Sequence, residues 1–466
     1  MNVAEKKLIK IKLAAIARDE AAYLPEWIFH HLDFGFDEIE IYINNTVDNS
    51  SAVLENINDN YPVKVINADK LFKKSSSNFQ SLAYTEITKN ALADGFTHLM
   101  LLDIDEFWTP ADFKTSIKEA IRLLNYPQVI NFNWFVHCDE EPFSTCYKNE
   151  IKIKTNAHVK TVFQLNGPWG KVRLHNVTGK DLVYTRGNGD SFDFGDSKLC
   201  GLSNAECLTH DYFVIHRMYR SEMEYISLLG RGRANKSKIK NNRPGYYKSE
   251  EIDKLGDDYD VIEFSTDLLK DYYLRFDQFI QACSLAPIIA QSETFVKSRF
   301  DKVMGWAAKA KGSDADLFYK LFLNIQLPQV IDLRKVLYRK VVQNKLDQRV
   351  MIKHSWLYLI YSIATKLFHH LGLTRLTRKF AFYASKNALD TNDKLLLDGA
   401  EIALKKISFP KQKYADFYRE MAIYYYNQGE LILACRFINE ANKCRPNEPM
   451  IIKLHKLYNE EANKVS

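Results

Sequence analysis

The chain has 466 residues, of which 46% are hydrophobic and 26% charged, a globular composition and a length that favours two or three domains. Its net charge of +6 is concentrated in residues 331–380, where eleven Lys and Arg accompany two Asp, so the rest of the chain is slightly acidic. This distribution excludes a nucleic-acid-binding surface spread over the whole protein, and we expect no nucleic-acid partner.

The first half of the chain alternates segments that have strand and helix patterns. Strand, helix, strand, helix, strand is the order of a parallel α/β sheet, whose ligands bind beyond the carboxyl ends of the strands. Strands are predicted at residues 8–17, 38–43, 63–66 and 129–136, and helices at 23–32, 52–57 and 81–93.

An apolar run that begins at Thr97 ends in three carboxylates, Asp103, Asp105 and Glu106. Residues 97–108 have the pattern of one buried strand that emerges at a sheet edge, and side-chain alternation would then place Asp103 and Asp105 on the same side. Two close carboxylates repel each other unless a cation neutralises them, and Mg²⁺ or Mn²⁺ prefers such ligands. The alternative is a solvated strand end followed by a helix N-cap.

Polar residues also follow two other predicted strands, at Arg18 and Asp48. Together with Asp103 they would converge on one edge of the sheet. Neither a G-x-G-x-x-G after the first strand nor a G-x-x-x-x-G-K-[ST] occurs, which argues against a dinucleotide site and a P-loop. A nucleotidyltransferase would carry a glycine-rich loop where this chain has residues 17–20.

Several ordered motifs within roughly the first 240 residues resemble the family-2-like and family-92-like glycosyltransferases. Asp19 departs from the Asn usual in that family, and Arg217 from the usual Tyr. The matching segments are Ala17-Arg18-Asp19-Glu20, Leu24-Pro25-Glu26-Trp27-Ile28-Phe29-His30-His31, Gly35-Phe36-Asp37-Glu38-Ile39, Asp48-Asn49-Ser50, Leu101-Leu102-Asp103-Ile104-Asp105-Glu106-Phe107, His216-Arg217-Met218-Tyr219-Arg220-Ser221 with Glu224, and Arg231-Gly232-Arg233.

The resemblance implies a hexosyltransferase-like enzyme of the glycosyltransferase A-type fold, with a Rossmann-like mixed sheet. It would use a nucleotide-diphosphate sugar, expected to be a UDP-sugar, and Mn²⁺ or Mg²⁺ to offset charge on the departing diphosphate. The implied metal ligands are Asp103, Asp105 and His216; the donor-binding residues are Arg18, Glu20, Asp48, Gln80, Tyr84, Asp103 and Arg220; the acceptor-side residues are Lys160, Trp169 and His175. For His216 and Trp169 a purely structural role is the alternative.

An inverting transfer also needs a carboxylate that takes the proton of the acceptor hydroxyl. Candidate carboxylates lie in two segments, after the strand at 129–136 and before His216, and the sequence favours a solvated loop charge for each of them. The candidate bases are Asp139, Glu140, Glu141, Glu206 and Asp211.

The second half, from about Glu263, has helical spacing. Residues 422–446 have the small-residue positions of a tetratricopeptide-like hairpin, for which residues 379–406 would supply neighbouring repeats. Between the halves, residues 331–380 include an apolar stretch, 356–368, with basic flanks. This pattern is typical of a helix at an anionic membrane surface, or of one buried between domains.

Seven cysteines without a C-x-x-C pair and a polar N-terminus favour a reducing compartment, so we expect a cytoplasmic protein, peripheral at most to the inner membrane face. The predicted domains are 1–260, catalytic; 261–380, a helical extension with the basic segment; and 381–466, tetratricopeptide-like and able to bind a protein partner. The expected acceptor is a glycan, a lipid-linked molecule or a protein in surface polysaccharide biosynthesis. The main alternative is a non-catalytic scaffold with a degenerate transferase domain, and a weaker one is a metal-dependent nucleotide-binding hydrolase.

Overall fold

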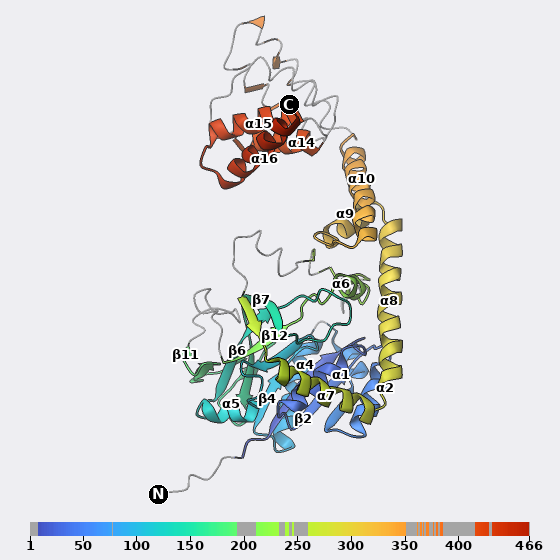
Figure 1. Ribbon diagram of the computed structural model, residues 1–466, viewed down its shortest axis with the longest axis vertical. Coiled ribbons are helices and arrows are strands. Elements are labelled where there is room, and N and C mark those ends of the chain that lie inside the picture. The colour runs from blue at the N-terminus through green and yellow to red at the C-terminus, as the bar shows by residue number, and fades with distance from the viewer. Residues whose placement is uncertain are drawn as a thin grey trace. The chain divides into compact units, whose positions relative to one another are not determined.

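The computed structural model describes residues 8–76, 78–192, 211–232, 238–241, 245–246, 260–350, 415–427 and 431–465, with single positions between 361 and 384. The chain divides into two compact units. The first comprises residues 1–310 and 314–337, and the second comprises 311–313 and 338–466. Figure 1 labels many of the helices and strands of both units. The predicted fold class is confirmed, because an α/β part with a mixed sheet precedes a helical part.

The first unit is built on a mixed sheet. Its main strands follow the order β11-β10-β6-β7-β4-β1-β2-β3. Neighbours from β4 to β3 are parallel, β7 is antiparallel to both β4 and β6, and β12 lies between β5 and β6. The strands are β1 (Ile11–Ala17), β2 (Glu38–Ile43), β3 (Val63–Asn67), β4 (His98–Leu101), β5 (Glu106–Pro110), β6 (Val129–Val136), β7 (Glu150–Gln164), β10 (Tyr184–Arg186), β11 (Ser191–Phe192), β12 (Tyr212–His216) and β13 (Asp260–Glu263), which pairs with β7.

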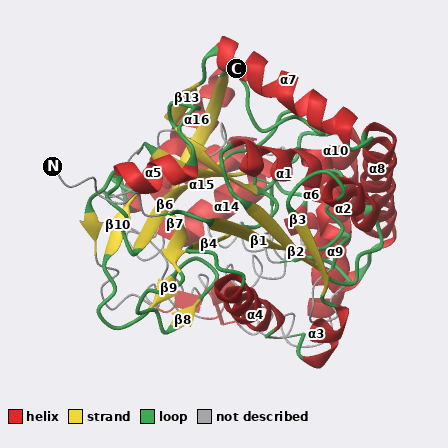
Figure 2. Cartoon of the chain, turned by 90° about the horizontal axis from the view of Figure 1, so that it is seen from below, coloured by secondary structure: helices red, strands yellow, loops and turns green. Residues whose placement is uncertain are grey.

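Helices cover both faces of the parallel strands, as Figure 2 shows. Alternate residues of β1 divide between two cores: Ile11 and Leu13 pack with α1 (Leu24–Asp33) and α2 (Ser50–Asn58), whereas Ala14 packs with α4 (Phe79–Ala93). The short helices α3 (Asp69–Lys74) and α5 (Ile117–Leu123) connect strands, and β8 (Lys171–Val172) pairs with β9 (Val177–Thr178) in a separate hairpin. This layering leaves the carboxyl ends of β1, β2 and β4 open to a ligand.

The apolar run at 97–108 is not one strand, as the sequence suggested. It forms β4 and β5, joined by a turn at residues 102–105 that contains Asp103 and Asp105. Strand alternation therefore does not determine where these two carboxylates point. The strand at 38–43 and the strand at 129–136 have the predicted bounds.

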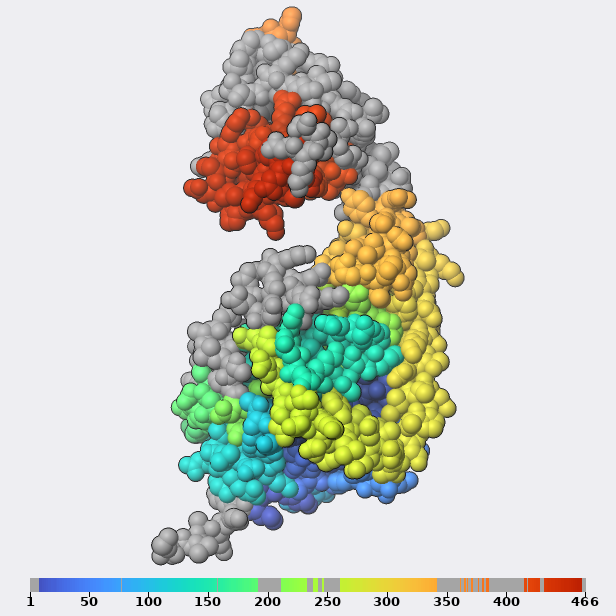
Figure 3. All heavy atoms as spheres, viewed as in Figure 1, coloured from blue at the N-terminus to red at the C-terminus, as the bar shows by residue number. Residues whose placement is uncertain are grey.

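Helices from beyond the sheet complete the first unit. They are α6 (Glu222–Leu229), α7 (Thr266–Ala282), α8 (Ala286–Lys309), α9 (Gly312–Leu321) and the start of α10 (Pro328–Val350). Tyr272 and Phe279 of α7 join the core below α1, and α7 and α8 form part of the outer surface in Figure 3. Gly230, at the end of α6, allows close packing because a Cβ there would lie 2.7 Å from Val303 Cγ2 of α8.

The second unit contains α14 (Ala415–Asn427), α15 (Leu431–Cys444) and α16 (Pro449–Val465). Ala422, Tyr425, Ala434, Ile438 and Ala441, which the sequence placed at the crossing of a helical hairpin, are all buried where α14 meets α15. The tetratricopeptide-like assignment stays a prediction, since Gly429 and most of residues 379–406 lie outside the described residues. Most of residues 351–380, the second part of the basic segment at 331–380, also lie outside the described residues. No helix among the described residues has the length and apolarity that crossing a membrane requires.

A buried lysine lies at the opposite end of the sheet from the carboxylate turn. Lys12 of β1 is inaccessible to solvent, and its Nζ lies 2.8 Å from Glu38, 2.7 Å from Glu40 and 3.2 Å from Asp94. Burial lowers the pKa of Lys12, but Glu38 and Glu40 outweigh it and the net shift is upward. Glu40 is itself fully buried, so its charge depends on this lysine.

We expect Lys12→Met to lower the free energy of unfolding by about 3–5 kcal/mol, because it leaves the Glu40 carboxylate buried without its main partner. Denaturant unfolding followed by tryptophan fluorescence measures this in the first unit, which holds Trp27, Trp108, Trp134, Trp169 and Trp306 of the six tryptophans. The half-exposed Lys64 also contacts Glu40, at 3.4 Å. Lys64→Met is the matched control and should cost less than about 1 kcal/mol; equal losses in the two variants would contradict this assignment.

Candidate active site

The turn between β4 and β5 is held by the third carboxylate of its motif. Glu106 Oε2 accepts the backbone N–H of Asp103 at 2.8 Å, and the N–H of Glu106 donates to the carbonyl of Asp103 at 3.0 Å. On the other side, the N–H of Arg217 donates to the carbonyl of Asp105 at 2.8 Å. These bonds orient the turn so that Asp103 and Asp105 lie at its solvent-facing end. Glu106 belongs to the matched motif at 101–107, but the sequence alone assigns it no role.

Lys160 of β7 is a buried cation that contacts two carboxylates of this turn. Its Nζ lies 2.8 Å from Glu106 Oε2 and 3.5 Å from Asp103 Oδ2, and its side chain is 2% exposed. Burial lowers the pKa of Lys160, but Asp103 and Glu106 outweigh it and the net shift is upward. Burial, assisted by Asp103 and Asp105 and opposed by Lys160, shifts the pKa of Glu106 upward. Lys160, predicted on the acceptor side, is thus a partner of the carboxylate turn.

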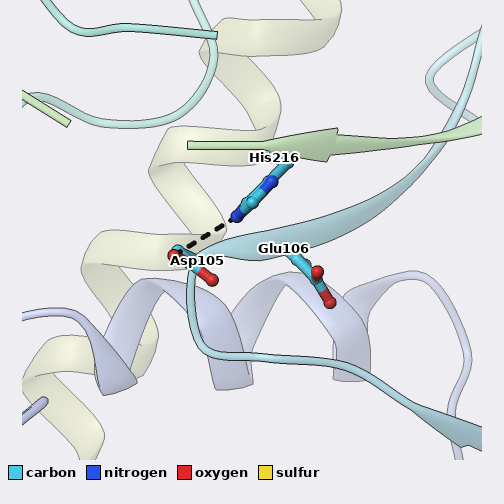
Figure 4. A group of neighbouring side chains, drawn as sticks. All are labelled: Asp105, Glu106 and His216. Atoms are coloured by element: carbon cyan, nitrogen blue, oxygen red, sulfur yellow. Dashed lines mark ion pairs between the residues drawn. The ribbon is translucent and has the colours of Figure 1, made fainter. Parts of the chain in front are cut away.

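His216 approaches the same turn from β12. The pairing of β12 with β5 sets His216 opposite Glu106, and His216 Nε2 lies 3.4 Å from Asp105 Oδ2, as Figure 4 shows. The imidazole stacks on the indole of Trp134 with ring centroids 4.0 Å apart and planes 8° apart. This stacking fixes the ring in the orientation that presents Nε2 to Asp105.

The residues present fit a divalent cation. Ligand atoms of Asp105, Glu106 and His216 all lie within 4.8 Å of one another, and octahedral ligands at the Mg²⁺ distance of about 2.1 Å would be about 3–4 Å apart. Glu106 Oε1 is buried and has no hydrogen-bond partner among the described residues. The predicted ligand Asp103 is instead 44% exposed and beside Lys160. The structure therefore groups Glu106, rather than Asp103, with Asp105 and His216.

A cleft of about 410 Å³ opens beside this turn at the carboxyl ends of β1 and β2. Five of the predicted metal- and donor-binding residues line it: Arg18, Glu20, Gln80, Asp103 and Asp105. The other lining residues are Ile16, Ala17, Asn44, Phe72, Phe79, Ile104, Arg231, Gly232 and Lys240.

The model of glycosyltransferase family 92 matches residues 14–165. The match supports a glycosyltransferase and confirms the resemblance predicted from the motifs. No curated protein matches the chain. The matched segment contains the carboxylate turn, Lys160 and all but three of the cleft-lining residues, the exceptions being Arg231, Gly232 and Lys240.

Inside the family 92 match, the Glu-Trp-x-x-His-His motif of α1 secures the backbone of β5. Trp27 Nε1 donates to the carbonyl of Glu106 at 2.8 Å, His30 Nε2 lies 2.7 Å from the carbonyl of Trp108, and His31 Nε2 lies 3.2 Å from the N–H of Trp108. Because β12 pairs with one edge of β5, these side chains serve the other edge, where a strand would otherwise pair. The motif is thus a structural support for the carboxylate turn.

Glu20 forms ion pairs with two arginines at the cleft wall. Arg220 Nη2 lies 3.1 Å from Glu20 Oε2 with its guanidinium stacked 3.4 Å over the ring of Tyr23, and Arg231 pairs with Glu20 Oε1. The sequence alone does not assign Arg231 to the site. The available signal is its place in the Arg231-Gly232-Arg233 motif, which follows Glu224 in the family resemblance.

Asp48 and Asp19 shape the loops behind the cleft. Asp48 accepts the N–H of Ala21 at 2.9 Å and the N–H and hydroxyl of Ser50, so it ties two loops together and does not line the cleft. Asp19, where the family usually has Asn, has φ +53° and accepts the N–H of Val47 at 2.8 Å. Both Asp and Asn tolerate this left-handed backbone, which explains how the exchange is accommodated.

The other family departure, Arg217, is explained by a buried ion-pair network. Arg217 bonds Asp139 Oδ2 at 2.7 Å and Glu26 Oε2 at 3.1 Å. Burial alone would raise the pKa of Asp139, but Arg217 and His137 bring it below its usual value. Asp139 is therefore occupied as a structural partner.

The remaining candidate bases are dispersed. Glu140 and Glu141 are exposed in the loop after β6, whose last residue pairs with His216. Asp211 is exposed and precedes β12, at the end of the strand opposite His216. Glu206 lies outside the described residues.

The predicted acceptor-side residues also lie in different parts of the structure and do not form one site. Trp169 packs on Phe163 and donates its indole N–H to the carbonyl of Leu165 at 3.1 Å, which is a structural role. Tyr84, predicted for the donor, and His175 line a second cavity. Gln80 Nε2 lies 3.0 Å from Tyr84 Oη, and this bond connects the walls of the two cavities.

The histidines of α1 predict a pH dependence. Burial lowers the pKa of His30 to about 4 and that of His31 well below its usual value, whereas unfolded imidazoles bind a proton below about pH 6.5. The unfolded state thus binds more protons, and the free energy of unfolding should fall as the pH drops from 6.5 towards 4. His30→Gln should reduce this slope by about 1.2 kcal/mol per pH unit between pH 5 and 6.

Denaturant unfolding at several pH values measures that slope, which is insensitive to any constant loss of stability in the variant. The exposed His370 of the second unit provides the control, because His370→Gln should leave the slope of the first unit unchanged. An unaltered slope in His30→Gln would show that His30 is protonated in the folded protein.

Proposed function

We propose that the protein is a glycosyltransferase that uses a nucleotide-diphosphate sugar, with a UDP-sugar as the donor, and a divalent cation. The observation that carries the proposal is the cleft at the carboxyl ends of the sheet, where Asp103 and Asp105 face a wall that contains Arg18 and Arg231. Acidic residues suit a cation and basic residues suit phosphates, so this one cleft offers both halves of a metal–diphosphate site.

Asp105 and His216 would hold the cation, with Glu106 Oε1 as the third protein ligand. An imidazole in this set favours Mn²⁺ over Mg²⁺, which prefers oxygen ligands. When bound, the cation offsets the charge that develops on the departing diphosphate. Trp134 and Lys160 orient His216 and Glu106 respectively, so the site is held in place by residues that do not bind the metal.

The basic wall of the cleft would receive the phosphates. Arg231 and Lys240 line it from the segments after α6, and Arg220 stands behind Glu20. Asp103 projects into the cleft with nearly half of its side chain exposed, which suits a hydrogen bond to the ribose. Arg18 and Gln80 complete the side of the cleft that would accept the nucleoside.

For the acceptor we propose a hydroxyl of a glycan, a lipid-linked molecule or a protein, in surface polysaccharide biosynthesis. Glu140 and Glu141 are the bases favoured by position, because their loop leaves the sheet beside His216: the N–H of His137 donates to the carbonyl of His216 at 3.0 Å. The neighbouring Asp139 is held by Arg217.

The test is binding of Mn²⁺ and of UDP-sugars by the full chain, measured by calorimetry with and without the metal. We expect UDP-sugar binding to require Mn²⁺, and Asp105→Asn to weaken Mn²⁺ binding by about 100-fold, because it removes a charged ligand. Donors that bind are then screened for release of UDP.

Asp112→Asn is the matched control, since this exposed aspartate follows the far end of β5 and has no part in the cleft. It should bind Mn²⁺ and UDP-sugars like the native chain. If the native chain binds no nucleotide sugar under any metal condition, the proposal fails and the non-catalytic scaffold is favoured. Nucleotide binding that is independent of metal and of Asp105 would remove the cation from the proposal.

A further inference from the structure

The second cavity, with a volume of about 370 Å³, lies between α4 and the β8–β9 hairpin. This volume falls in the range of small-molecule sites. Its lining residues are Ser81, Tyr84, Lys171, Val172, Arg173, Leu174 and His175.

The cavity combines an apolar wall with positive charge. Val172, Leu174 and the ring of Tyr84 offer surface suited to the C–H faces of a sugar, and Lys171 and Arg173 are exposed cations. Burial, reinforced by Lys160, lowers the pKa of His175 to about 4, so its ring is neutral at neutral pH. The positive charge is therefore that of Lys171 and Arg173.

Acidic residues are missing from this lining among the described residues, in contrast to the first cleft, which Glu20, Asp103 and Asp105 line. Within the same part of the chain, neither Lys171 nor Arg173 is paired with a carboxylate. Two cations without a counter-charge at the rim of a cavity attract an anionic ligand and disfavour a cationic one.

The second cavity is physically connected to the carboxylate turn. Lys160, which binds Asp103 and Glu106, also reaches the carbonyl of Leu174 at 3.5 Å. The hydroxyl of Thr161, the next residue of β7, donates to the carbonyl of His175 at 2.8 Å. One strand therefore positions both the turn of the first cleft and a wall of the second cavity.

We infer that the second cavity binds an acidic sugar unit of the acceptor, with its carboxylate or phosphate held by Lys171 and Arg173. The inference rests on the proposed function, because it takes the first cleft as the donor site and this neighbouring cavity as the acceptor site. It narrows the acceptor from any glycan to one that carries a negative charge close to the sugar that is extended.

The test compares three sugars that differ in charge: glucuronate, glucose 6-phosphate and glucose. Their dissociation constants from the full chain are measured by ligand-observed NMR titration at low salt. We expect at least one acidic sugar to bind about tenfold more tightly than glucose, as two charge-assisted contacts allow. Comparison of the two acidic sugars shows whether a carboxylate or a phosphate is preferred.

The double variant Lys171→Gln/Arg173→Gln should lose this preference and bind the acidic sugars within about twofold of glucose. The double variant Arg122→Gln/Lys180→Gln makes the same change in net charge at exposed positions outside both cavities. It should keep the preference, because only the local charges at the cavity matter.

The inference is overturned if native protein shows no preference for acidic sugars, or if both double variants lose it equally. It is also overturned if inorganic phosphate displaces glucose 6-phosphate at equal concentration, since the cavity would then bind anions without a sugar. Mn²⁺-dependent UDP binding, measured on the same samples, separates the two proposals. If UDP binds and the preference is absent, only this inference fails; if the preference is present and UDP does not bind, the proposed function fails.

Discussion

The buried contact between Glu106 and Lys160 is the interaction on which the site depends. A carboxylate and an ammonium 2.8 Å apart, both removed from solvent, stabilise each other only while both are present. One oxygen of Glu106 also accepts the N–H of Asp103, so the ion pair determines the shape of the turn. The turn that contains Asp103 and Asp105 is therefore held by side chains of the protein itself.

The supports around this contact come from distant parts of the chain. Trp27, His30 and His31 of α1 bond to the backbone of β5, and β12 pairs with its other edge while supplying His216. Arg217, the next residue, links Glu26 of α1 to Asp139 after β6. The motifs in α1 and at the end of β12, which are far apart in the sequence, thus contact each other around β5.

Much of the parallel sheet could be predicted from the sequence, because hydrophobic periodicity and turn residues are local signals. The strand at 38–43 and the helix that starts near Leu24 illustrate this. The turn inside residues 97–108 could not, since its cause is the side-chain bond from Glu106 back to Asp103 and not a glycine or proline. The roles of Glu106 and Arg231 also depend on long-range side-chain contacts, which local sequence does not reveal. Likewise, the sequence leaves Asp139 as a candidate base, whereas in the structure Arg217, 78 residues away, pairs with it.

Glu20 affects how an anionic ligand binds in the cleft. Its two oxygens hold Arg220 and Arg231 in place, as an incoming phosphate would. An anionic ligand in the cleft must therefore compete with the Glu20 carboxylate for Arg231, which lines the cleft, and part of its binding energy goes into that exchange. Under the proposed function the exchange would also run in reverse, because Glu20 would re-form its ion pair with Arg231 as the nucleotide product leaves, and this would limit product retention.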